Sequence, residues 1–426
     1  MSSPNPPRNR RRSLALGAAG LALAGAALAP APASAGPAGT GEPLDETLAR
    51  IHEAGIPGVY GATRDGGQRW HGASGVADTS TGRPTQPQMR HRIGSVTKTF
   101  TAVGLLQQAE RGTVDLDAPV ADYLPGLLPD DLGQAVTVRM LLNHTSGIGD
   151  YVLLAFPSLL EGTGDSLEEH RFREITREEL VALGLQAPRT GEPGERHSYS
   201  NTNYVIAGLL LEEVTGTDAQ DYLTEHVIRP AGLRHTYFPD GPRLRGPHAK
   251  MYEGLHGLLD PPRDFSVYHM SWAAEAGALV STMDDLNTFY AALFSGELIS
   301  DASLAEMMTT VPVEDATGQI VGAYGLGLYP LQLPCGTFWG HDGAVWGAGT
   351  YAFSSPDGER QASLGLTRMK YQEVTEDGEL VPHPADQAAS IHLVVALCGE
   401  DALSPARAAT APPVLPTPSA LPAATR

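Results

Sequence analysis

Patterns typical of β-strands lie at the two ends of this chain, and patterns typical of helices lie between them. Near the start, residues 58–78 contain two short apolar runs around a turn at residues 65–67, which predicts a hairpin. Near the end, residues 336–370 predict three more strands, and residues 385–399 predict a helix. The simplest fold consistent with this order is one antiparallel sheet built from both chain ends.

The middle of the chain, roughly residues 106 to 320, has mostly helical spacing of apolar residues. We therefore expect an α/β (α+β) fold, in which the antiparallel sheet is flanked by helices and carries an inserted, mostly helical lobe. The predicted ranges are 42–105 plus 321–402 for the α/β lobe and 106–320 for the helical lobe. About 360 residues are more than one hydrophobic core usually serves, which also favours two lobes.

Both ends of the chain lie outside the expected fold. Residues 1–35 read as a secretory signal peptide: basic residues precede a Leu, Ala and Gly run, and residues 33–35 form a small-residue cleavage site. A membrane anchor is the alternative, but the run is short and Pro30 and Pro32 interrupt it. We therefore expect a secreted protein, exported by the general or the twin-arginine route. Residues 403–426, rich in Pro, Ala and Thr, predict a disordered tail open to processing.

The chain is acidic and contains two cysteines. Its formal net charge of -20 becomes -24 once the four arginines of the signal, which has no acidic residue, are removed. Such a charge argues against binding to nucleic acid or to an anionic surface. No segment after the signal is long and apolar enough to span a bilayer. In an oxidising compartment Cys335 and Cys398 would most simply form a disulfide, with two buried thiols as the alternative.

The segment RIGSVTKTF, residues 92–100, holds one of only three lysines in a chain with 26 arginines. Ser95 lies at a predicted helix start, and Lys98 lies on the same helical face. A serine hydroxyl is a poor nucleophile unless a base takes its proton. A buried lysine can be that base because burial lowers its pKa, whereas an arginine stays protonated. The alternative is a capping serine followed by a solvated lysine.

Two further segments offer polar groups suited to the same chemistry. Tyr199 and Asn201, on a loop entering a predicted helix, provide a second proton carrier and an amide that can bind a substrate carbonyl. On a predicted strand, Gly343 would let a backbone N–H approach a developing oxyanion, and His341 supplies a titratable positive group. Each residue alone also fits a helix cap or a core histidine, but their order and separation favour a common site.

These elements resemble the Ser-x-x-Lys, Tyr-x-Asn and His-x-Gly motifs of the penicillin-recognising serine hydrolases. That family includes D-alanyl-D-alanine carboxypeptidases, class C β-lactamases, and related esterases and aminopeptidases. The segments LLNHTSGI and YSNTNYVIAGLLLEEVTG are especially similar to the secreted actinomycete carboxypeptidase/transpeptidase type. The resemblance extends from Asp45 to Gly399 and implies a β-lactamase/transpeptidase-like fold, an acyl-enzyme mechanism and a disulfide between Cys335 and Cys398.

The resemblance also implies a role for each matching residue. Ser95 would be acylated, Lys98 would activate it, and Tyr199 would carry protons to the leaving group and later activate water. Asn201 would bind the substrate amide, and the backbone N–H groups of Ser95 and Ala344 would form the oxyanion hole. Whether Lys98 or Tyr199 is the first base stays open, because coupled groups titrate as a unit. No metal and no cofactor is implied.

Some positions do not determine which substrate the protein binds. Trp272 resembles an aromatic wall of the pocket, although core packing explains it equally well. Asp342 stands where carboxypeptidases often have a hydroxyl residue, Ala344 where the similar type has a threonine, and Tyr329 where it has an arginine. These positions help to hold a substrate carboxylate in that family. Asp342 either faces the leaving-group side or turns away to pair with His341.

The sequence therefore predicts a secreted, monomeric serine hydrolase. The first expectation is a D-alanyl-D-alanine carboxypeptidase that acts on peptidoglycan stem peptides and binds β-lactams. The alternatives are an esterase, amidase, D-aminopeptidase or β-lactamase on the same fold, and a receptor that β-lactams acylate with little turnover. The expected ligands are small peptides or esters, with no nucleic acid and no membrane span once the signal is removed.

Overall fold

The computed structural model describes residues 41–375 and 380–403 of the chain. The predicted signal peptide, and the predicted tail from residue 404 onward, lie outside these ranges. The main sheet consists of β1 (Gly58–Asp65), β2 (Gln68–Asp78), β3 (Arg83–Pro84), β10 (Tyr329–Leu333), β11 (Gly336–Val345), β12 (Ala348–Ser354) and β13 (Arg360–Leu366).

The longer helices and the short helical turns connect these strands. The α-helices are α1 (Gly41–Glu53), α2 (Thr97–Glu110), α3 (Asp130–Ala135), α4 (Val138–Leu142), α5 (Val152–Ala155), α6 (Asp165–Glu169), α7 (Arg177–Gln186), α8 (Asn201–Thr215), α9 (Ala219–Leu223), α10 (Ala274–Gly277), α11 (Met283–Phe294), α12 (Asp301–Met307) and α13 (Pro384–Cys398). The short turns are η1 (Gly94–Val96), η2 (Val120–Asp122), η3 (Pro157–Glu161), η4 (Thr224–Ile228), η5 (Leu255–Gly257) and η6 (Glu400–Leu403).

Smaller sheets lie outside the main one. Their strands are β4 (His91–Arg92) with β7 (Val280–Ser281), β5 (Tyr252–Glu253) with β6 (Arg263–Asp264) and β14 (Arg368–Met369), and β8 (Val311–Glu314) with β9 (Ile320–Tyr324).

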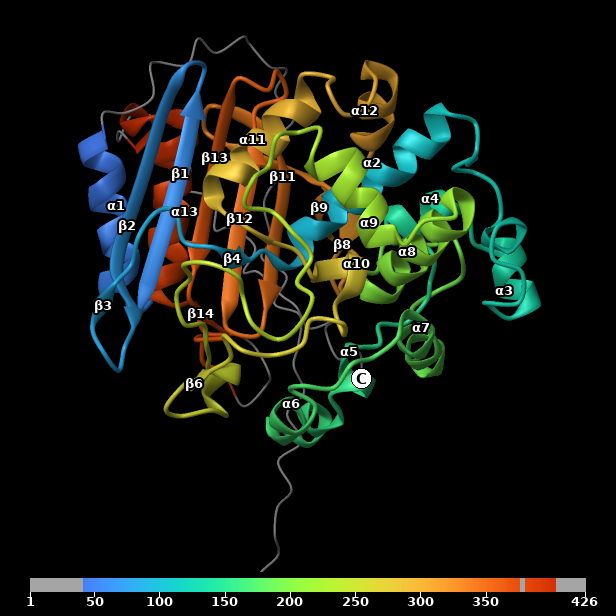
Figure 1. The fold of residues 1–426 in the computed structure, drawn as a ribbon, viewed down its shortest axis with the longest axis horizontal. Coiled ribbons are helices and arrows are strands. Elements are labelled where there is room, and N and C mark those ends of the chain that lie inside the picture. The colour runs from blue at the N-terminus through green and yellow to red at the C-terminus, as the bar shows by residue number, and fades with distance from the viewer. Residues whose placement is uncertain (1–40, 376–379, 404–426) are drawn as a thin grey trace, which may run out of the picture.

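The main sheet joins the two ends of the chain, as the sequence predicts. Its strand order is β10-β11-β12-β13-β1-β2-β3. The central pairing is between β1 and β13, which run antiparallel with Val59 opposite Leu366. The predicted hairpin is β1 and β2, whose last paired residues are Asp65 and Gln68. The antiparallel sheet flanked by helices is therefore confirmed (Figure 1).

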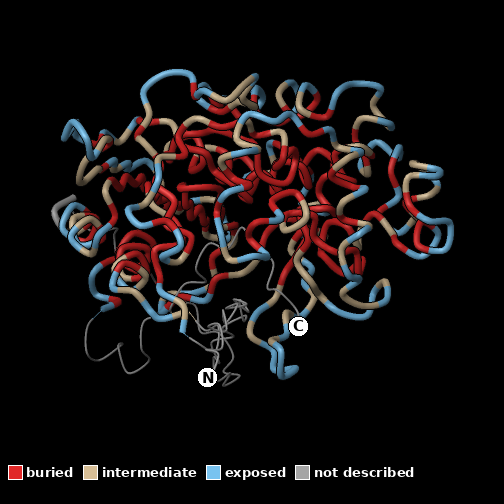
Figure 2. Tube along the Cα trace, turned by 90° about the horizontal axis from the view of Figure 1, so that it is seen from below, coloured by how far each residue is buried: buried red, intermediate tan, exposed pale blue. Residues whose placement is uncertain are grey.

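Helices cover both faces of this sheet. One face packs against α1 and α13 through a cluster that includes Leu48, Leu364 and Leu393. The other face packs against α2 and α11, where Phe100 and Phe289 stack with their ring centroids 3.7 Å apart. Figure 2 shows the buried segments running through the middle of the molecule. The helix α11 lies within the range predicted for the inserted lobe, yet it contacts the sheet strands β1, β12 and β13.

The helices from α3 to α8, together with α10, contribute to a second packed region beside the sheet (Figure 1). Its core reaches the sheet through Val345 and Trp346 at the end of β11. The active-site candidates on η1, α2, α8 and β11 therefore lie where the two regions meet. The ranges of the two lobes remain a prediction.

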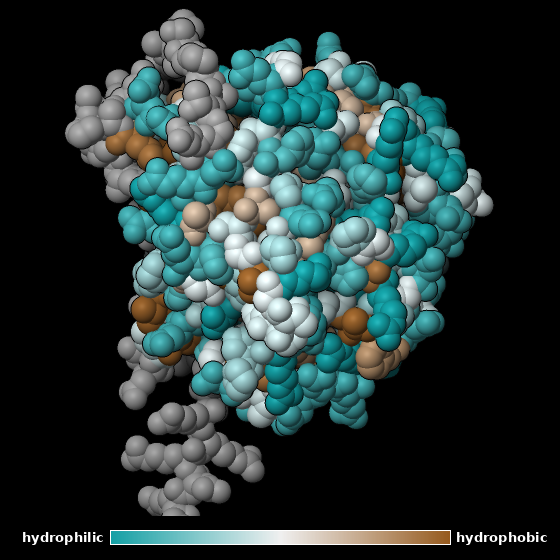
Figure 3. Space-filling model, turned by 60° about the vertical axis from the view of Figure 1, so that its left-hand side comes forward, coloured by the Kyte–Doolittle hydropathy of each residue, from teal (hydrophilic) through white to brown (hydrophobic). Residues whose placement is uncertain are grey.

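The surface carries few large exposed apolar side chains. The face in Figure 3 is largely hydrophilic, with hydrophobic residues scattered over it. Within the described ranges, no helix combines the length and the apolar character that crossing a membrane requires.

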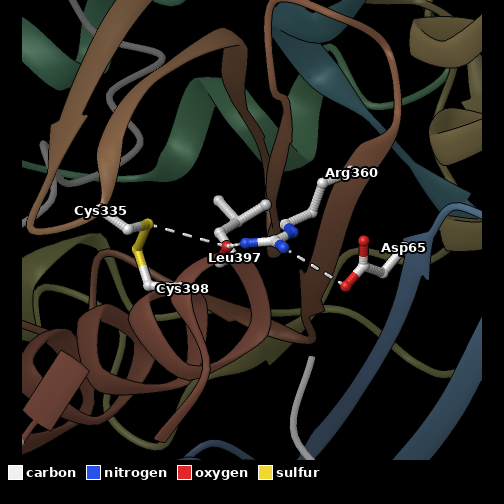
Figure 4. Close-up of a disulfide and its surroundings, with 5 residues drawn as sticks. All are labelled: Asp65, Cys335, Arg360, Leu397 and Cys398. Carbon is white, nitrogen blue, oxygen red and sulfur yellow. Dashed lines mark hydrogen bonds and ion pairs between the residues drawn. A yellow bond between two sulfur atoms is a disulfide. The ribbon is translucent and has the colours of Figure 1, made fainter. Parts of the chain in front are cut away.

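A disulfide joins Cys335, in the turn between β10 and β11, to Cys398 at the end of α13. Arg360 on β13 donates a 2.7 Å hydrogen bond to the Leu397 carbonyl oxygen and lies 3.4 Å from the Asp65 carboxylate (Figure 4). These contacts attach the last helix to the same sheet that carries β11.

The disulfide predicts a measurable loss of stability when it is removed. Its cysteines are 63 residues apart in sequence, and closing a loop of that length constrains the unfolded chain by about 4 kcal/mol in the chain-entropy model. Replacing Cys335 and Cys398 together by alanine should lower the urea midpoint accordingly. Dithiothreitol should lower the wild-type midpoint to the same value. Equal midpoints with and without the bond would contradict a stabilising role.

Candidate active site

Ser95 lies in η1, directly before α2, and its backbone is placed by glycine. Gly94 has a φ of +54°, a conformation that residues with a side chain rarely adopt. The Thr97 hydroxyl donates a 2.7 Å hydrogen bond to the Gly94 carbonyl oxygen, which closes the turn. Ser95 itself is 7% exposed, so most of the residue is shielded from solvent.

Lys98 points from the first turn of α2 toward three oxygens. Its Nζ lies 3.1 Å from Ser95 Oγ, 2.8 Å from Asn201 Oδ1 and 2.8 Å from the Ala276 carbonyl oxygen. A neutral amine has two N–H donors and one lone pair. Because the amide and carbonyl oxygens can only accept, they take the two donors and leave the lone pair for the serine hydroxyl.

The charge state of Lys98 fits a base. The side chain is fully buried, and this burial lowers its pKa to about 7, although the negative charges of Asp150 and Asp342 act in the opposite direction. A substantial fraction of Lys98 is therefore neutral near pH 7. The predicted pairing of Ser95 and Lys98 is present in the structure.

Tyr199 lies on the loop before α8 and covers the lysine. Lys98 Nζ lies 4.8 Å from the centre of the Tyr199 ring. The Tyr199 hydroxyl is buried and has no hydrogen-bond partner among the described residues. Burial raises its pKa well above the usual value, and proximity to the Ser95 hydroxyl lowers it only in part. Tyr199 is thus a protonated group with a free donor beside the nucleophile.

Asn201, the first residue of α8, is held by a carboxylate that the sequence analysis did not single out. Asp150 Oδ2 accepts hydrogen bonds from Asn201 N at 2.6 Å and from Asn201 Nδ2 at 2.8 Å. Asp150 is only 9% exposed. A single acid within the otherwise apolar and small-residue segment GIGDYVLLAF was the signal that could have drawn attention to it.

The two backbone N–H groups expected to bind an oxyanion come from segments in contact. A side chain at Gly343 would place its Cβ 2.0 Å from the Ile93 carbonyl oxygen and 2.9 Å from Ser95 N. A Cβ at Gly94 would lie 2.6 Å from Ala344 N. Both positions therefore need glycine, because only then can β11 approach η1 this closely. This approach brings the backbone segments that carry the amides of Ser95 and Ala344 close together.

His341 is neutral, which differs from the positive group expected from the sequence. Its Nδ1 donates to the Asp342 carbonyl oxygen, so Nε2 is the acceptor of the Tyr324 hydroxyl at 2.8 Å. Burial and, to a smaller extent, the charge of Lys98 together lower the pKa of His341 to about 3. An imidazole buried beside a lysine cannot easily gain a second charge. The Asp342 carbonyl oxygen fixes this tautomer because it can only accept, and Tyr324, which binds the opposite ring nitrogen, was missed from the sequence.

Asp342 has two neighbours, and only one of them binds it closely. Tyr329 donates a 2.9 Å hydrogen bond to Asp342 Oδ1, whereas His341 Nδ1 lies 3.7 Å from the same oxygen. Alternation along β11 puts Asp342 on the same face as Ala344, but of these two residues only Ala344 lines the pocket beside Ser95. Burial raises the pKa of Asp342 to about 6, so its carboxylate is largely ionised at pH 7.

A pocket with about 230 Å³ of space, including its mouth, opens beside Ser95. The other lining residues are Tyr151, Asn201, Trp272, Ala273, Ala276, Gly277, Ala344 and Val345. Trp272 both lines this pocket and packs in the core, where its ring stacks on Trp346 with centroids 5.3 Å apart. Both interpretations of Trp272 are therefore compatible with its position.

Comparisons with known proteins agree with this geometry. The family model described as Beta-lactamase matches residues 44–383. Penicillin-binding protein 4* of Bacillus subtilis is 28% identical over 295 residues, covering 67% of this chain and 61% of that protein. A D-aminopeptidase of Cereibacter sphaeroides is 30% identical over 308 residues, covering 71% of this chain and 55% of that protein. The matches thus span less than two thirds of these relatives.

Similar solved structures belong to related hydrolases, and this chain covers a larger share of each of them. A D-stereospecific amidohydrolase from Streptomyces sp. has a TM-score of 0.70 and 34% identity, covering 77% of this chain and 94% of that one. D-amino acid amidase from Ochrobactrum anthropi has a TM-score of 0.68 and 25% identity, covering 83% and 98%. The chain belongs to the Beta-lactamase family and is a serine hydrolase with the fold of β-lactamases and penicillin-binding proteins.

Proposed function

We propose that the protein is a serine amidohydrolase that cleaves D-amino-acid amides, esters or short peptides whose leaving group carries no carboxylate. The observation that carries this choice is the hydrogen bond between Tyr329 and Asp342, which occupy two positions that help to hold a substrate carboxylate in the similar carboxypeptidases. The D-stereospecific amidohydrolase, D-amino acid amidase and D-aminopeptidase among the similar proteins support it.

Acylation would begin at Ser95. Its oxygen attacks the substrate carbonyl carbon while its proton passes to Lys98 Nζ, which lies 3.1 Å away. The carbonyl oxygen becomes negative and is held by the N–H groups of Ser95 and Ala344. We assign Lys98 as this first base because its pKa is about 7, whereas that of Tyr199 is far higher.

The leaving group then needs a proton. Tyr199 donates its hydroxyl proton to the departing nitrogen or oxygen as the carbonyl bond to it breaks, and Tyr199 regains a proton from Lys98. This leaves an ester on Ser95 and a neutral Lys98. A water molecule attacks the ester and gives a proton to Lys98, which returns it to the departing Ser95 oxygen. The cycle thus needs no group beyond those described.

Electrostatics on the leaving-group side disfavour a terminal carboxylate. The charge of Lys98 acts on the Asp342 carboxylate. Tyr329 offers no positive charge to a substrate carboxylate, because burial raises its pKa well above the usual value and the phenol stays neutral. Two carboxylates about 5 Å apart repel by about 3 kcal/mol at an effective dielectric constant near 20, which is about 100-fold in kcat/KM. Neutral or cationic leaving groups avoid this repulsion.

The D-alanyl-D-alanine carboxypeptidase expected from the sequence is the second candidate, and the similarity to penicillin-binding proteins favours it. Both proposals include secretion, because the enzyme would encounter cell-wall peptides outside the cell. The predicted monomer stays a prediction, since one similar solved structure is an octameric penicillin-binding protein homologue from Pyrococcus abyssi.

Lys98→Arg should abolish acylation almost as fully as Lys98→Ala. Arginine keeps a positive charge but cannot accept the proton of Ser95. The measurement is the rate at which a fluorophosphonate labels the protein, with Ser95→Ala as the unlabelled control. Both lysine variants should label at least 1000-fold more slowly than wild type, on the scale of losing a general base. Rapid labelling of Lys98→Arg would show that only the charge matters.

The acylation rate of the wild type should rise with pH and level off above pH 8. The active form has a neutral Lys98, so the rate increases through its pKa of about 7. Stopped-flow measurement of single-turnover acylation between pH 5 and 9 checks this, in steps of about half a unit. A profile that is flat over this range, or that falls with rising pH, would rule out a lysine base.

Asp342→Thr should raise kcat/KM only for substrates with a carboxylate on the leaving group. Wild type should prefer a D-amino-acid amide to a diacetyl-Lys-D-Ala-D-Ala tripeptide, and the substitution should narrow the preference by about 100-fold. Asp284→Thr is the matched control, because Asp284 also pairs with a histidine, His71 at 2.9 Å, but lies on α11. An unchanged preference in Asp342→Thr would leave the carboxypeptidase proposal standing.

A further inference from the structure

We propose that Asp150 is a positioning residue of this site, which fixes the direction in which the Asn201 amide faces and balances the charge of Lys98. This inference rests on the proposed function, because it concerns how the acylating base and the substrate-binding amide are set. Asp150 precedes α5. It belongs to none of the catalytic sequence motifs and does not contact Lys98 directly.

The hydrogen bonds of Asp150 show an ionised carboxylate. Its Oδ2 accepts from Asn201 N and Asn201 Nδ2, and its Oδ1 accepts from Val152 N at 2.8 Å. All three partners are donors, and none of the described residues offers an acceptor to a carboxyl proton. Burial leaves the pKa of Asp150 above its ordinary value, and the three N–H donors oppose this rise because they favour the charged form.

This carboxylate decides which way the Asn201 side chain is turned. In the observed orientation the amide oxygen accepts from Lys98, and one N–H of Nδ2 points to Asp150. Turning the amide by 180° would set its oxygen against the carboxylate and its NH₂ against the lysine. The contact with the carboxylate would then be repulsive, and so would the contact with Lys98 whenever the lysine is protonated. The second N–H of Nδ2 stays available to a substrate carbonyl, and Asn201 lines the pocket beside Ser95.

Asp150 is also the main negative neighbour of Lys98. The two side chains share no hydrogen bond, and the Asn201 amide bridges them. Asp150 comes before Asp342 among the charges that oppose the effect of burial on Lys98. The other titratable groups facing Lys98 are His144, His341, Tyr199 and Tyr204, and each is kept neutral near pH 7 by burial.

Two substitutions separate the charge from the hydrogen bonds. In Asp150→Asn, the side-chain carbonyl oxygen can still accept both bonds from Asn201, but the negative charge and the hydrogen bond from Val152 N are lost. In Asp150→Ala, both the charge and the orienting contact are lost. Asp264→Asn is the matched control, because Asp264 Oδ1 accepts from Ser266 N at 2.9 Å in the same type of turn, away from Lys98.

The readout is the pH dependence of fluorophosphonate acylation, normalised to the folded fraction from circular dichroism. Asp150→Asn should keep the plateau rate within about tenfold and move the acid limb to lower pH by about one unit, because the protonated lysine loses its counter-charge. Asp150→Ala should also lower the plateau at least 100-fold, since the amide is free to turn. Asp264→Asn should match wild type in both respects.

The outcomes are distinguishable. Suppose that wild type labels at Ser95 and its labelling rate falls at low pH. If neither Asp150 variant then changes the pH of this fall or the plateau rate, after correction for its folded fraction, this inference is overturned and the proposed function stands. If wild type fails to label at Ser95, both are overturned. A shifted limb in Asp150→Asn alone, with Asp264→Asn unchanged, supports the inference even when Asp150→Ala does not fold.

Discussion

The site depends on one buried amine. Lys98 Nζ contacts a serine on η1, an amide on α8 and a carbonyl oxygen on α10, so three separate segments converge on a single nitrogen. An isolated ammonium at this depth would be costly to desolvate. Three oxygen atoms around the amine offset part of that cost. The Asp150 carboxylate, which binds the Asn201 amide on the side away from Lys98, offsets more of it. The resulting balance leaves the lysine ready to take a proton.

The rest of the fold keeps those segments in place. The sheet holds β11 against η1, and the two glycines at positions 94 and 343 make that approach possible. On the other side, α10 is tied to α7 through Arg177, which donates to the buried Glu275 at 2.7 Å. Glu275 is the residue before Ala276, whose carbonyl oxygen binds Lys98. The position of the catalytic nitrogen is thus coupled to both packed regions.

Much of this arrangement could be predicted from the sequence, because local patterns report local structure. The hairpin around residues 65–67 and the Ser95-Lys98 spacing both follow from chain geometry at short range. The role of Asp150 could not be predicted, because its partner Asn201 is 51 residues away and no spacing rule links them. His341 was expected to be positive, but its charge depends on burial and on its proximity to Lys98, which only the folded chain establishes.

The most direct test of this account is the pKa of Lys98 itself. The chain has three lysines, so ¹³C- or ¹⁵N-labelled lysine gives a simple NMR spectrum that can be followed with pH. The account predicts one signal that titrates with a midpoint near 7 and disappears in Lys98→Met. If none of the three signals changes below pH 9, Lys98 is a permanent cation and cannot be the base that activates Ser95.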